Sequence, residues 1–124
     1  MALLRCGAGA VLNLFKGKYI SFTNGTTPVI TNMSNSLSCV QTSGGYGVMI
    51  ADVSNYTSVR TQNTVNPINN GAIFGIKHDG SVAYIGNTNS SSNPNLTHNI
   101  TDYDFIIGVF MNADYATTCN WTLS

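Results

Sequence analysis

The stretch IFGIKHDGSVAYI, residues 73–85, decides the fold class, because two apolar arms flank a short polar turn. Asp79-Gly80 is among the strongest sequence signals for a tight β-hairpin turn. If these two residues form the centre of the turn, Gly75 pairs with Tyr84, whose ring then covers the glycine across the hairpin. The stretch therefore predicts two antiparallel strands joined by a two-residue turn.

His78 stands beside Asp79 in this turn, which raises the question of a catalytic His-Asp pair. Adjacent residues in a tight turn tend to point apart, and a catalytic triad gathers its members from distant parts of a chain. The sequence marks neither a nucleophile nor a pair of acids. We therefore interpret both residues as turn residues and predict no catalytic residue and no enzymatic activity.

The rest of the chain has the composition of an all-β protein. Only 8% of its 124 residues are charged, against about 25% in a typical soluble protein. Glu is absent and Lys and Arg together number 5, so good formers of exposed helices are scarce. Asn, Ser and Gly favour turns, while Thr, Val, Ile and the aromatic residues favour strands. We predict an all-β fold, an antiparallel β-sandwich of jelly-roll-like form, in one domain spanning residues 1–124.

Charge and motifs exclude several classes of partner. The net charge is +0 at pH 7, so the basic surface of a nucleic-acid-binding protein is missing. The apolar start is shorter than the roughly 20 residues that span a bilayer and lacks the pattern of a signal peptide, so we expect no membrane insertion. His78 and His98 lack partners at metal-ligand spacing, and we predict no metal and no cofactor. Low, balanced charge instead favours self-association.

Two segments, YGVMIADV at 46–53 and FIIGVFM at 105–111, are apolar on both faces of a strand. Such a strand is covered on both faces, either by a second layer of its own domain or by another subunit. Both alternatives stay open from the sequence. If a subunit covers these strands, the predicted interface consists of apolar residues on them: Phe105, Ile106, Ile107, Val109, Phe110, Met111, Val48, Met49 and Ile50.

The first fifteen residues, MALLRCGAGAVLNLF, are apolar and weakly charged. We expect them to form an arm that docks onto a neighbouring protein. The side chains predicted to make this contact are the larger apolar ones of the segment: Leu3, Leu4, Val11, Leu12, Leu14 and Phe15.

The whole profile resembles the small β-rich structural proteins of tailed bacteriophages, such as head decoration proteins, fibre modules and adhesins. Four features carry the resemblance: the start MALLRCGAGAVL, the scarcity of charge, polar loops such as NTNSSSNPNLT (87–97), and the apolar final strands FIIGVFMN and CNWTLS. The resemblance implies a homo-oligomer, with a trimer favoured, and other virion proteins as partners. It also implies a virion location after synthesis in the host cytoplasm.

The sequence thus predicts first a non-enzymatic virion protein that self-associates and decorates or attaches to a capsid or fibre. The alternative is a carbohydrate-binding adhesin or receptor-binding module, with a host glycan as partner. Exposed Tyr among Asn and Thr suits sugar binding. In this alternative, the polar segment 87–99 is interpreted as a loop that carries recognition.

Overall fold

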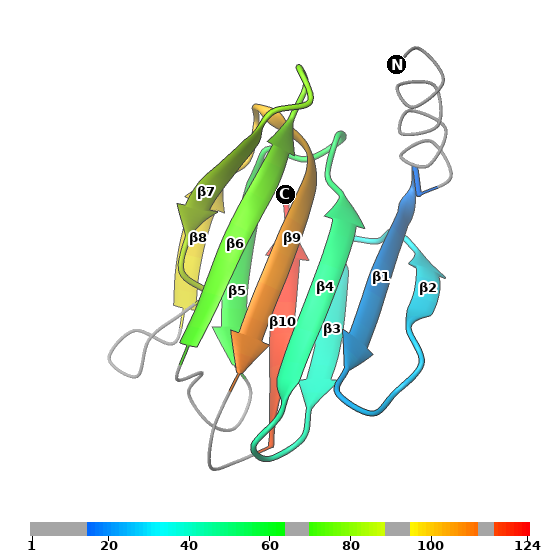
Figure 1. Cartoon of the computed structure of the whole chain (residues 1–124). Helices are drawn as coiled ribbons and strands as arrows, with labels where there is room; N and C mark the ends of the chain where they lie inside the picture. The colour runs from blue at the N-terminus through cyan, green and yellow to red at the C-terminus, as the bar shows by residue number, and fades with distance from the viewer. Residues whose placement is uncertain (1–14, 64–69, 89–94, 112–115) are drawn as a thin grey trace.

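The computed structural model describes residues 15–63, 70–88, 95–111 and 116–124, which form two packed antiparallel sheets (Figure 1). The larger sheet has the strand order β2 (Val29–Asn32), β1 (Lys18–Thr23), β4 (Tyr46–Asp52), β9 (Tyr103–Met111), β6 (Asn70–Lys77) and β7 (Val82–Gly86). The smaller sheet has the order β3 (Ser36–Gln41), β10 (Thr117–Leu123), β5 (Ser58–Asn63) and β8 (Asn95–Asn99). The predicted all-β, antiparallel sandwich is confirmed.

The chain crosses between the two sheets at most of its connections. Among the described strands, only the β1–β2 and β6–β7 connections join neighbours in one sheet. Connections that alternate between two packed sheets are typical of jelly rolls. No helix in the described part of the chain is long and apolar enough to cross a membrane.

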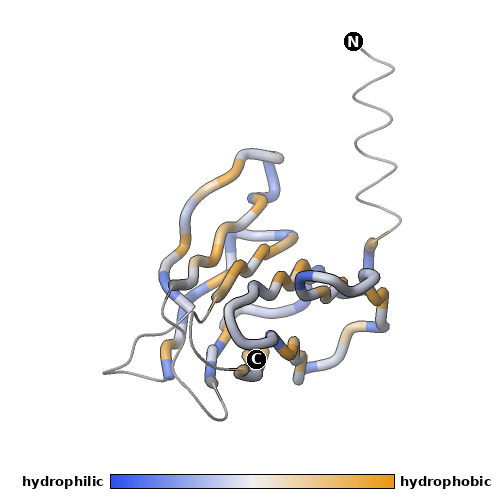
Figure 2. Tube along the Cα trace, turned by 60° about the horizontal axis from the view of Figure 1, so that its bottom comes forward, coloured by the Kyte–Doolittle hydropathy of each residue, from blue (hydrophilic) through white to orange (hydrophobic). Residues whose placement is uncertain are grey.

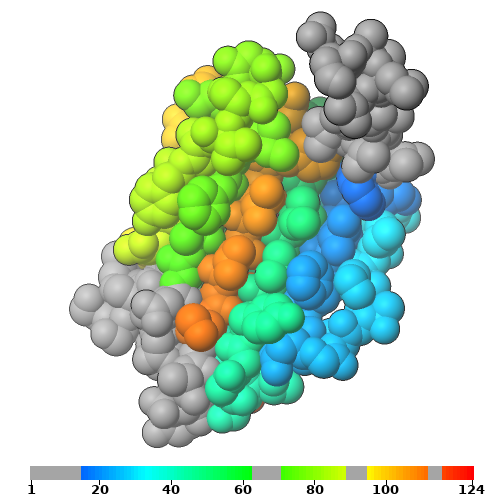
Figure 3. Space-filling view, viewed as in Figure 1, coloured from blue at the N-terminus to red at the C-terminus, as the bar shows by residue number. Residues whose placement is uncertain are grey.

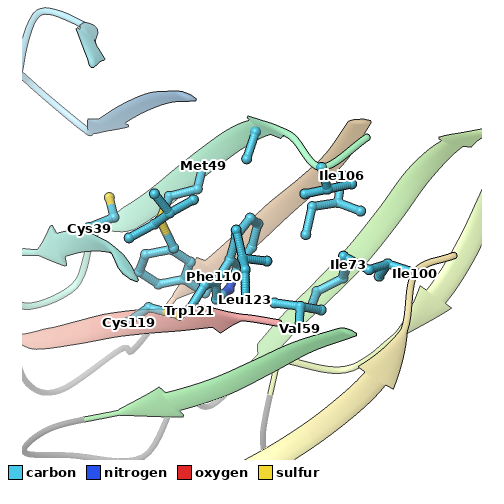
Figure 4. Close-up of a cluster of buried hydrophobic side chains, with 13 residues drawn as sticks. Cys39, Met49, Val59, Ile73, Ile100, Ile106, Phe110, Cys119, Trp121 and Leu123 are labelled. Carbon is cyan, nitrogen blue, oxygen red and sulfur yellow. The ribbon is translucent and has the colours of Figure 1, made fainter. Parts of the chain in front are cut away.

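The core lies between the sheets and is built mainly from alternate residues of β3, β4, β5, β6, β9 and β10 (Figure 4). Trp121 on β10 is its largest fully buried side chain, and Phe110 on β9 is 1% exposed. The Trp121 ring lies over Gly108 of β9, where an added Cβ would come within 2.2 Å of the indole Cζ2. The buried apolar cluster consists of Leu37, Cys39, Met49, Ala51, Val53, Val59, Ile73, Ile100, Ile106, Phe110, Cys119, Trp121 and Leu123.

The β6–β7 hairpin confirms the predicted pair of strands, but its turn is longer than predicted. The N–H of Lys77 donates to the Ser81 oxygen (2.8 Å), and the N–H of Gly80 donates to the Lys77 oxygen (2.9 Å). Gly80 has φ of 87°, so the loop is a three-residue turn with a glycine in the left-handed region. The Asp79 carboxylate stabilises this loop, because it accepts hydrogen bonds from the N–H and the hydroxyl of Ser81 (2.9 and 2.6 Å).

The extra loop residue changes the register of the hairpin, so the predicted pairing of Gly75 with Tyr84 is wrong. Tyr84 lies opposite Phe74, and the two rings pack edge to face with centroids 5.6 Å apart. The ring that covers Gly75 belongs to Tyr103, whose Cδ1 would lie 2.2 Å from an added Cβ. The shift places Phe74 and Tyr84 on the outer face of the larger sheet.

The smaller sheet contains strands in segments where the sequence is largely polar. Residues 95–99 form β8, although the sequence was interpreted as a loop over 87–99. Across this sheet, the outward positions are almost all small and uncharged, apart from Val40 and Arg60. We call this surface the polar face: Ser36, Ser38, Ser58, Gln62, Asn95, Thr97, Asn99, Thr118, Asn120 and Thr122.

Candidate functional site

The two sheets differ in width, and the difference creates a groove at one side of the sandwich. β3, the edge strand of the smaller sheet, packs against β1 and β4, while β1 and β2 extend past it (Figure 1). The inner side of the β1–β2 hairpin and the edge of β3 enclose a groove of about 340 Å³. We call it the overhang groove. Its lining residues are Ser21, Phe22, Thr23, Thr26, Thr27, Val29, Ser38, Cys39 and Val40.

The turn between β1 and β2 is held by its own threonines. The Thr26 hydroxyl donates to the Thr23 main-chain oxygen (2.8 Å) and accepts from the Thr23 N–H (3.1 Å). Gly25, with φ of 77°, allows the chain to reverse here. Among the described residues, the hydroxyls of Ser21, Thr27 and Ser38 have no protein hydrogen-bond partner. The groove therefore offers three hydroxyls that a ligand can engage.

The free edge of β3 adds main-chain groups to the same groove. Antiparallel pairs alternate between hydrogen-bonded and non-hydrogen-bonded positions. The N–H of Leu123 donates to the Asn35 oxygen (2.8 Å), so the alternation places Cys39 in a hydrogen-bonded pair with β10. Ser38 and Val40 then direct their N–H and C=O groups away from β10, toward the overhang. These groups are positioned donors and acceptors.

The overhang groove carries no charge. None of its lining side chains is Asp, Glu, Lys, Arg or His. Burial raises the pKa of the Cys39 thiol despite its contacts with the Val48 and Phe22 oxygens, so this group stays neutral at physiological pH. The thiol lies 3.6 Å from the Phe22 oxygen, at the floor of the groove. A neutral ligand rich in hydroxyl groups matches this lining better than an anion or a cation does.

A second surface is the outer face of the larger sheet, which is apolar across all six strands. The pairing register places one apolar residue of each strand in a single row: Ile30, Ile20, Ile50, Ile107, Phe74 and Tyr84. The next row contains Phe22, Val48, Val109 and Ala72. With Tyr46, Ile76, Val82, Phe105 and Met111, these residues form what we call the apolar face. Figure 3 shows this side of the larger sheet in a space-filling view.

Large side chains on the apolar face are open to solvent. Val82, Ile30 and Tyr84 are 66%, 59% and 58% exposed, and Val109 at the centre is 42% exposed. The hydrophobic residues along neighbouring strands stand out in orange in Figure 2. Monomeric soluble proteins rarely expose contiguous apolar patches larger than a few hundred Å². This side of the sandwich therefore differs from the polar face and is a candidate contact surface.

The structure divides the predicted interface residues between two environments. Three of them, Met49, Ile106 and Phe110, have buried side chains in the core and cannot contact another subunit, so this part of the prediction is wrong. The reason is the alternation of a strand, which turns every second side chain toward the other sheet. Phe105 lies on the outer side of the larger sheet but is only 7% exposed, so little of it is open to another subunit. The others are half-buried or exposed on the same side, and their role stays a prediction: Val48, Ile50, Ile107, Val109 and Met111.

Of the predicted docking arm, only Phe15 belongs to the described residues. It is half-buried, and its main-chain oxygen accepts a hydrogen bond from the N–H of Lys18 (3.0 Å) at the entry to β1. The remaining arm residues lie outside the described residues: Leu3, Leu4, Val11, Leu12 and Leu14.

His78 does find a carboxylate partner, but the partner is Asp104 at the start of β9 and not the adjacent Asp79. The His78 Nδ1 lies 2.6 Å from Asp104 Oδ1, and Nε2 lies 3.1 Å from the Thr101 oxygen. The two side chains are 59% and 42% exposed. Among the described residues, no Ser, Thr or Cys side chain is hydrogen-bonded to this imidazole. The pair links the β6–β7 turn to β9.

The pH dependence of this pair can be tested. Hydrogen bonding to Asp104, the main cause, raises the pKa of His78 above its ordinary value. Because the folded pKa is the higher one, the pair stabilises the fold below the ordinary imidazole pKa of about 6.5, and this contribution disappears as the pH rises through the folded pKa. We expect Asp104→Asn to lower the pKa of His78 in an NMR titration. Asp102→Asn should lower it less, since Asp102 acts only at a distance. Equal effects of the two variants would contradict the assignment.

The comparisons with known proteins bear on the fold. The sequence matches no protein-family model and no curated protein. Chitosan-binding module 1 of a chitosanase/glucanase from Paenibacillus sp. IK-5 is 8% identical, with a TM-score of 0.51 over 87% of this chain and 96% of that chain. The SPBc2 prophage-derived protein YomS is 8% identical, with a TM-score of 0.50 over 77% of this chain and 99% of that one.

A further similar structure is the family 32 carbohydrate-binding module from Streptococcus pneumoniae EndoD, 9% identical, with a TM-score of 0.48 over 89% and 97% of the two chains. Carbohydrate-binding modules predominate among the similar structures, and a prophage protein is also among them. At these identities the similarity shows the fold alone. The similarity in fold to the prophage protein is consistent with the resemblance to β-rich phage proteins.

The groove residues were not predicted as a site from the sequence. Asn24-Gly25 signals a turn, and Thr26 and Thr27 extend it with hydroxyls. Nothing in the polar segment around Ser38 shows that a sheet edge will lie beside this turn. The groove exists only because β1 and β2 extend past β3, which is a property of the packed sheets.

Proposed function

We propose that the protein is a non-catalytic carbohydrate-binding module and that the overhang groove holds a neutral glycan. The observation that carries the proposal is the lining of the groove, which combines unpartnered hydroxyls with apolar side chains and no charge. Sugar rings present hydroxyl groups at their edges and C–H groups on their faces. Ser21, Thr27 and Ser38 would pair with the former, and Val29 and Val40 would pack against the latter.

The size and position of the groove support this proposal. Small-molecule sites have volumes of roughly 300–1,000 Å³, and the groove has about 340 Å³, at the small end of that range. The N–H and C=O groups of Ser38 and Val40 are held by the sheet, so a ligand gains hydrogen bonds without ordering a loop. The similarity in fold to carbohydrate-binding modules agrees with such a role. The absence of a cation from the lining disfavours acidic glycans as ligands.

The test begins with a glycan array that contains neutral and acidic oligosaccharides. We expect the full chain to capture neutral ones, and isothermal titration with the best of them to give a measurable affinity. Ser38→Phe, which places a ring in the groove, should weaken binding by about tenfold or more, because the ligand loses both space and a hydroxyl partner. The matched control is Thr97→Phe on β8, an exposed position at the opposite edge of the same sheet.

Circular dichroism will establish that both phenylalanine variants are folded. Two results would overturn the proposal. One is the absence of any captured glycan with the wild-type chain. The other is an affinity that Ser38→Phe and Thr97→Phe change equally.

A role as a self-associating structural protein of a virion is a second proposal, and the apolar face favours it. A face of this kind is stable in water only if it is small or covered, and virion proteins are covered by their neighbours. Incorporation of the protein into purified phage particles, detected by mass spectrometry, would support this role. Its absence from particles made by cells that express it would count against the role.

A further inference from the structure

We infer that the apolar face pairs with the apolar face of a second copy of this chain. The inference is independent of the proposed glycan site, which lies on the other side of the β1–β2 hairpin. Phe22 is common to both surfaces, since its register places its side chain on the apolar face while its main-chain oxygen accepts the Cys39 thiol at the groove.

The first argument is area. Six strands at a spacing of about 4.8 Å, with apolar positions over about 20 Å of strand, give a planar face of roughly 500 Å². Two such faces together bury a planar area of roughly 1,000 Å², which reaches the lower limit for a specific interface. The side chains that project from the faces add to this buried area. A single copy would leave this face in water at a size that is unusual for a monomer.

The second argument is charge. The two central rows of the apolar face contain no charged side chain, so two identical faces meet without repulsion. The nearest carboxylate in the register, Asp52 at the end of β4, already accepts the N–H of Gly17 (2.6 Å) and the hydroxyl of Ser54 (2.7 Å). Lys18, on the same side of β1 at the beginning of the strand, donates to the Asn32 Oδ1. A charged partner would find no charge to pair with in the two central rows, and a second copy buries no unpaired charge there.

The third argument is shape. Two twisted sheets pack face to face about 10 Å apart, with their strands roughly 30° from parallel. A two-fold axis in the plane between the two faces, inclined to the strands by half this angle and midway between β4 and β9, lays β4 on the partner's β9 and β1 on the partner's β6. In this arrangement the aromatic pair Phe74 and Tyr84 meets the isoleucines of the partner's β1 and β2. Bulky and smaller apolar side chains are then complementary across an isologous interface.

The test is the mass of the full chain by size-exclusion chromatography with light scattering, at protein concentrations from about 1 to 100 μM. We expect twice the monomer mass of 13.2 kDa at the upper end. Val109→Lys puts a charge at the centre of the face and should raise the dimer dissociation constant by about tenfold or more, because the charge enters the interface twice. Val109 is 42% exposed in the single copy, so the lysine can reach water in a monomer.

The matched control is Thr97→Lys, an exposed position on β8 that lies on the polar face, away from both the apolar face and the overhang groove. This variant should dimerise like the wild type. Val82→Lys is a second variant, for the case that Val109→Lys does not fold. Val82 is 66% exposed at the edge of the face, and its replacement by Lys should also weaken the dimer. A wild-type monomer at about 100 μM overturns the inference, and so does a trimer, which a two-fold pairing cannot form. Equal effects of Thr97→Lys and Val109→Lys overturn it as well. Glycan binding by a monomeric wild type would leave the proposed function standing.

Discussion

A Trp121→Ala variant is expected to lose about 3–5 kcal/mol of unfolding free energy. Trp121 is completely buried and is the largest such side chain of the described residues. Its ring fills the space between β10 and β9 and lies against the backbone at Gly108. Removing it leaves a cavity that the paired strands cannot close without breaking their register. The loss would take a large part of the stability of a typical domain.

The measurement is urea unfolding followed by circular dichroism, because Trp121 is the single tryptophan of the chain and its fluorescence disappears in the variant. Thr122→Ala is the matched control, since Thr122 is the next residue on β10 and faces solvent. We expect that control to change the unfolding free energy by less than about 0.5 kcal/mol. A similar small loss in Trp121→Ala would show that the ring does not support the core.

The opposite change in the same place, Gly108→Ala, is expected to cost about 1–3 kcal/mol. The added methyl group would lie 2.2 Å from one indole carbon and 2.8 Å from another. An indole in a packed core has little room to move, so the sheets must separate or the ring must leave its rotamer. Urea unfolding of the wild type and the variant measures the loss directly.

A second substitution distinguishes overpacking from a strand-propensity effect of the alanine. In a Trp121→Phe background, the smaller ring leaves room for the methyl group, so the two changes should cost less together than the sum of the separate costs. Strict additivity would contradict the packing explanation. Neither substitution touches the overhang groove, and glycan affinity serves as an independent check of the fold.

The sequence predicted the larger sheet well and the smaller sheet poorly. Strands β1, β4, β6, β7 and β9 all carry long apolar residues, and such residues are the strongest signal for a strand. β5 and β8 consist mostly of Ser, Thr, Asn and Gln, and these residues make up half of β3. The residues at their outward positions are small and polar. A single inward apolar residue, such as Val59 or Leu96, is therefore not enough to reveal the alternation of apolar and polar residues that is typical of a strand.

The sequence also could not predict which side chains of the larger sheet face the smaller sheet and which face solvent. The alternation of 105–111 separates its two sets of side chains correctly, but both sets are apolar. No property of the strand itself says which set meets the other sheet. Trp121 and Gly108 settle the choice in three dimensions, because the large ring fits only against the face that carries the glycine. The groove likewise depends on where one sheet ends relative to the other.

The unequal width of the two sheets has a consequence for affinity at a crowded surface. In a face-to-face pair, the overhang groove of each copy lies on the side of the β1–β2 hairpin that faces away from the contact, so the two grooves of the pair are open at once. A second binding event is then intramolecular, and the combined affinity can exceed that of one groove by about two to four powers of ten. A shallow, uncharged groove that binds single oligosaccharides weakly would hold firmly to a surface on which the same glycan is repeated.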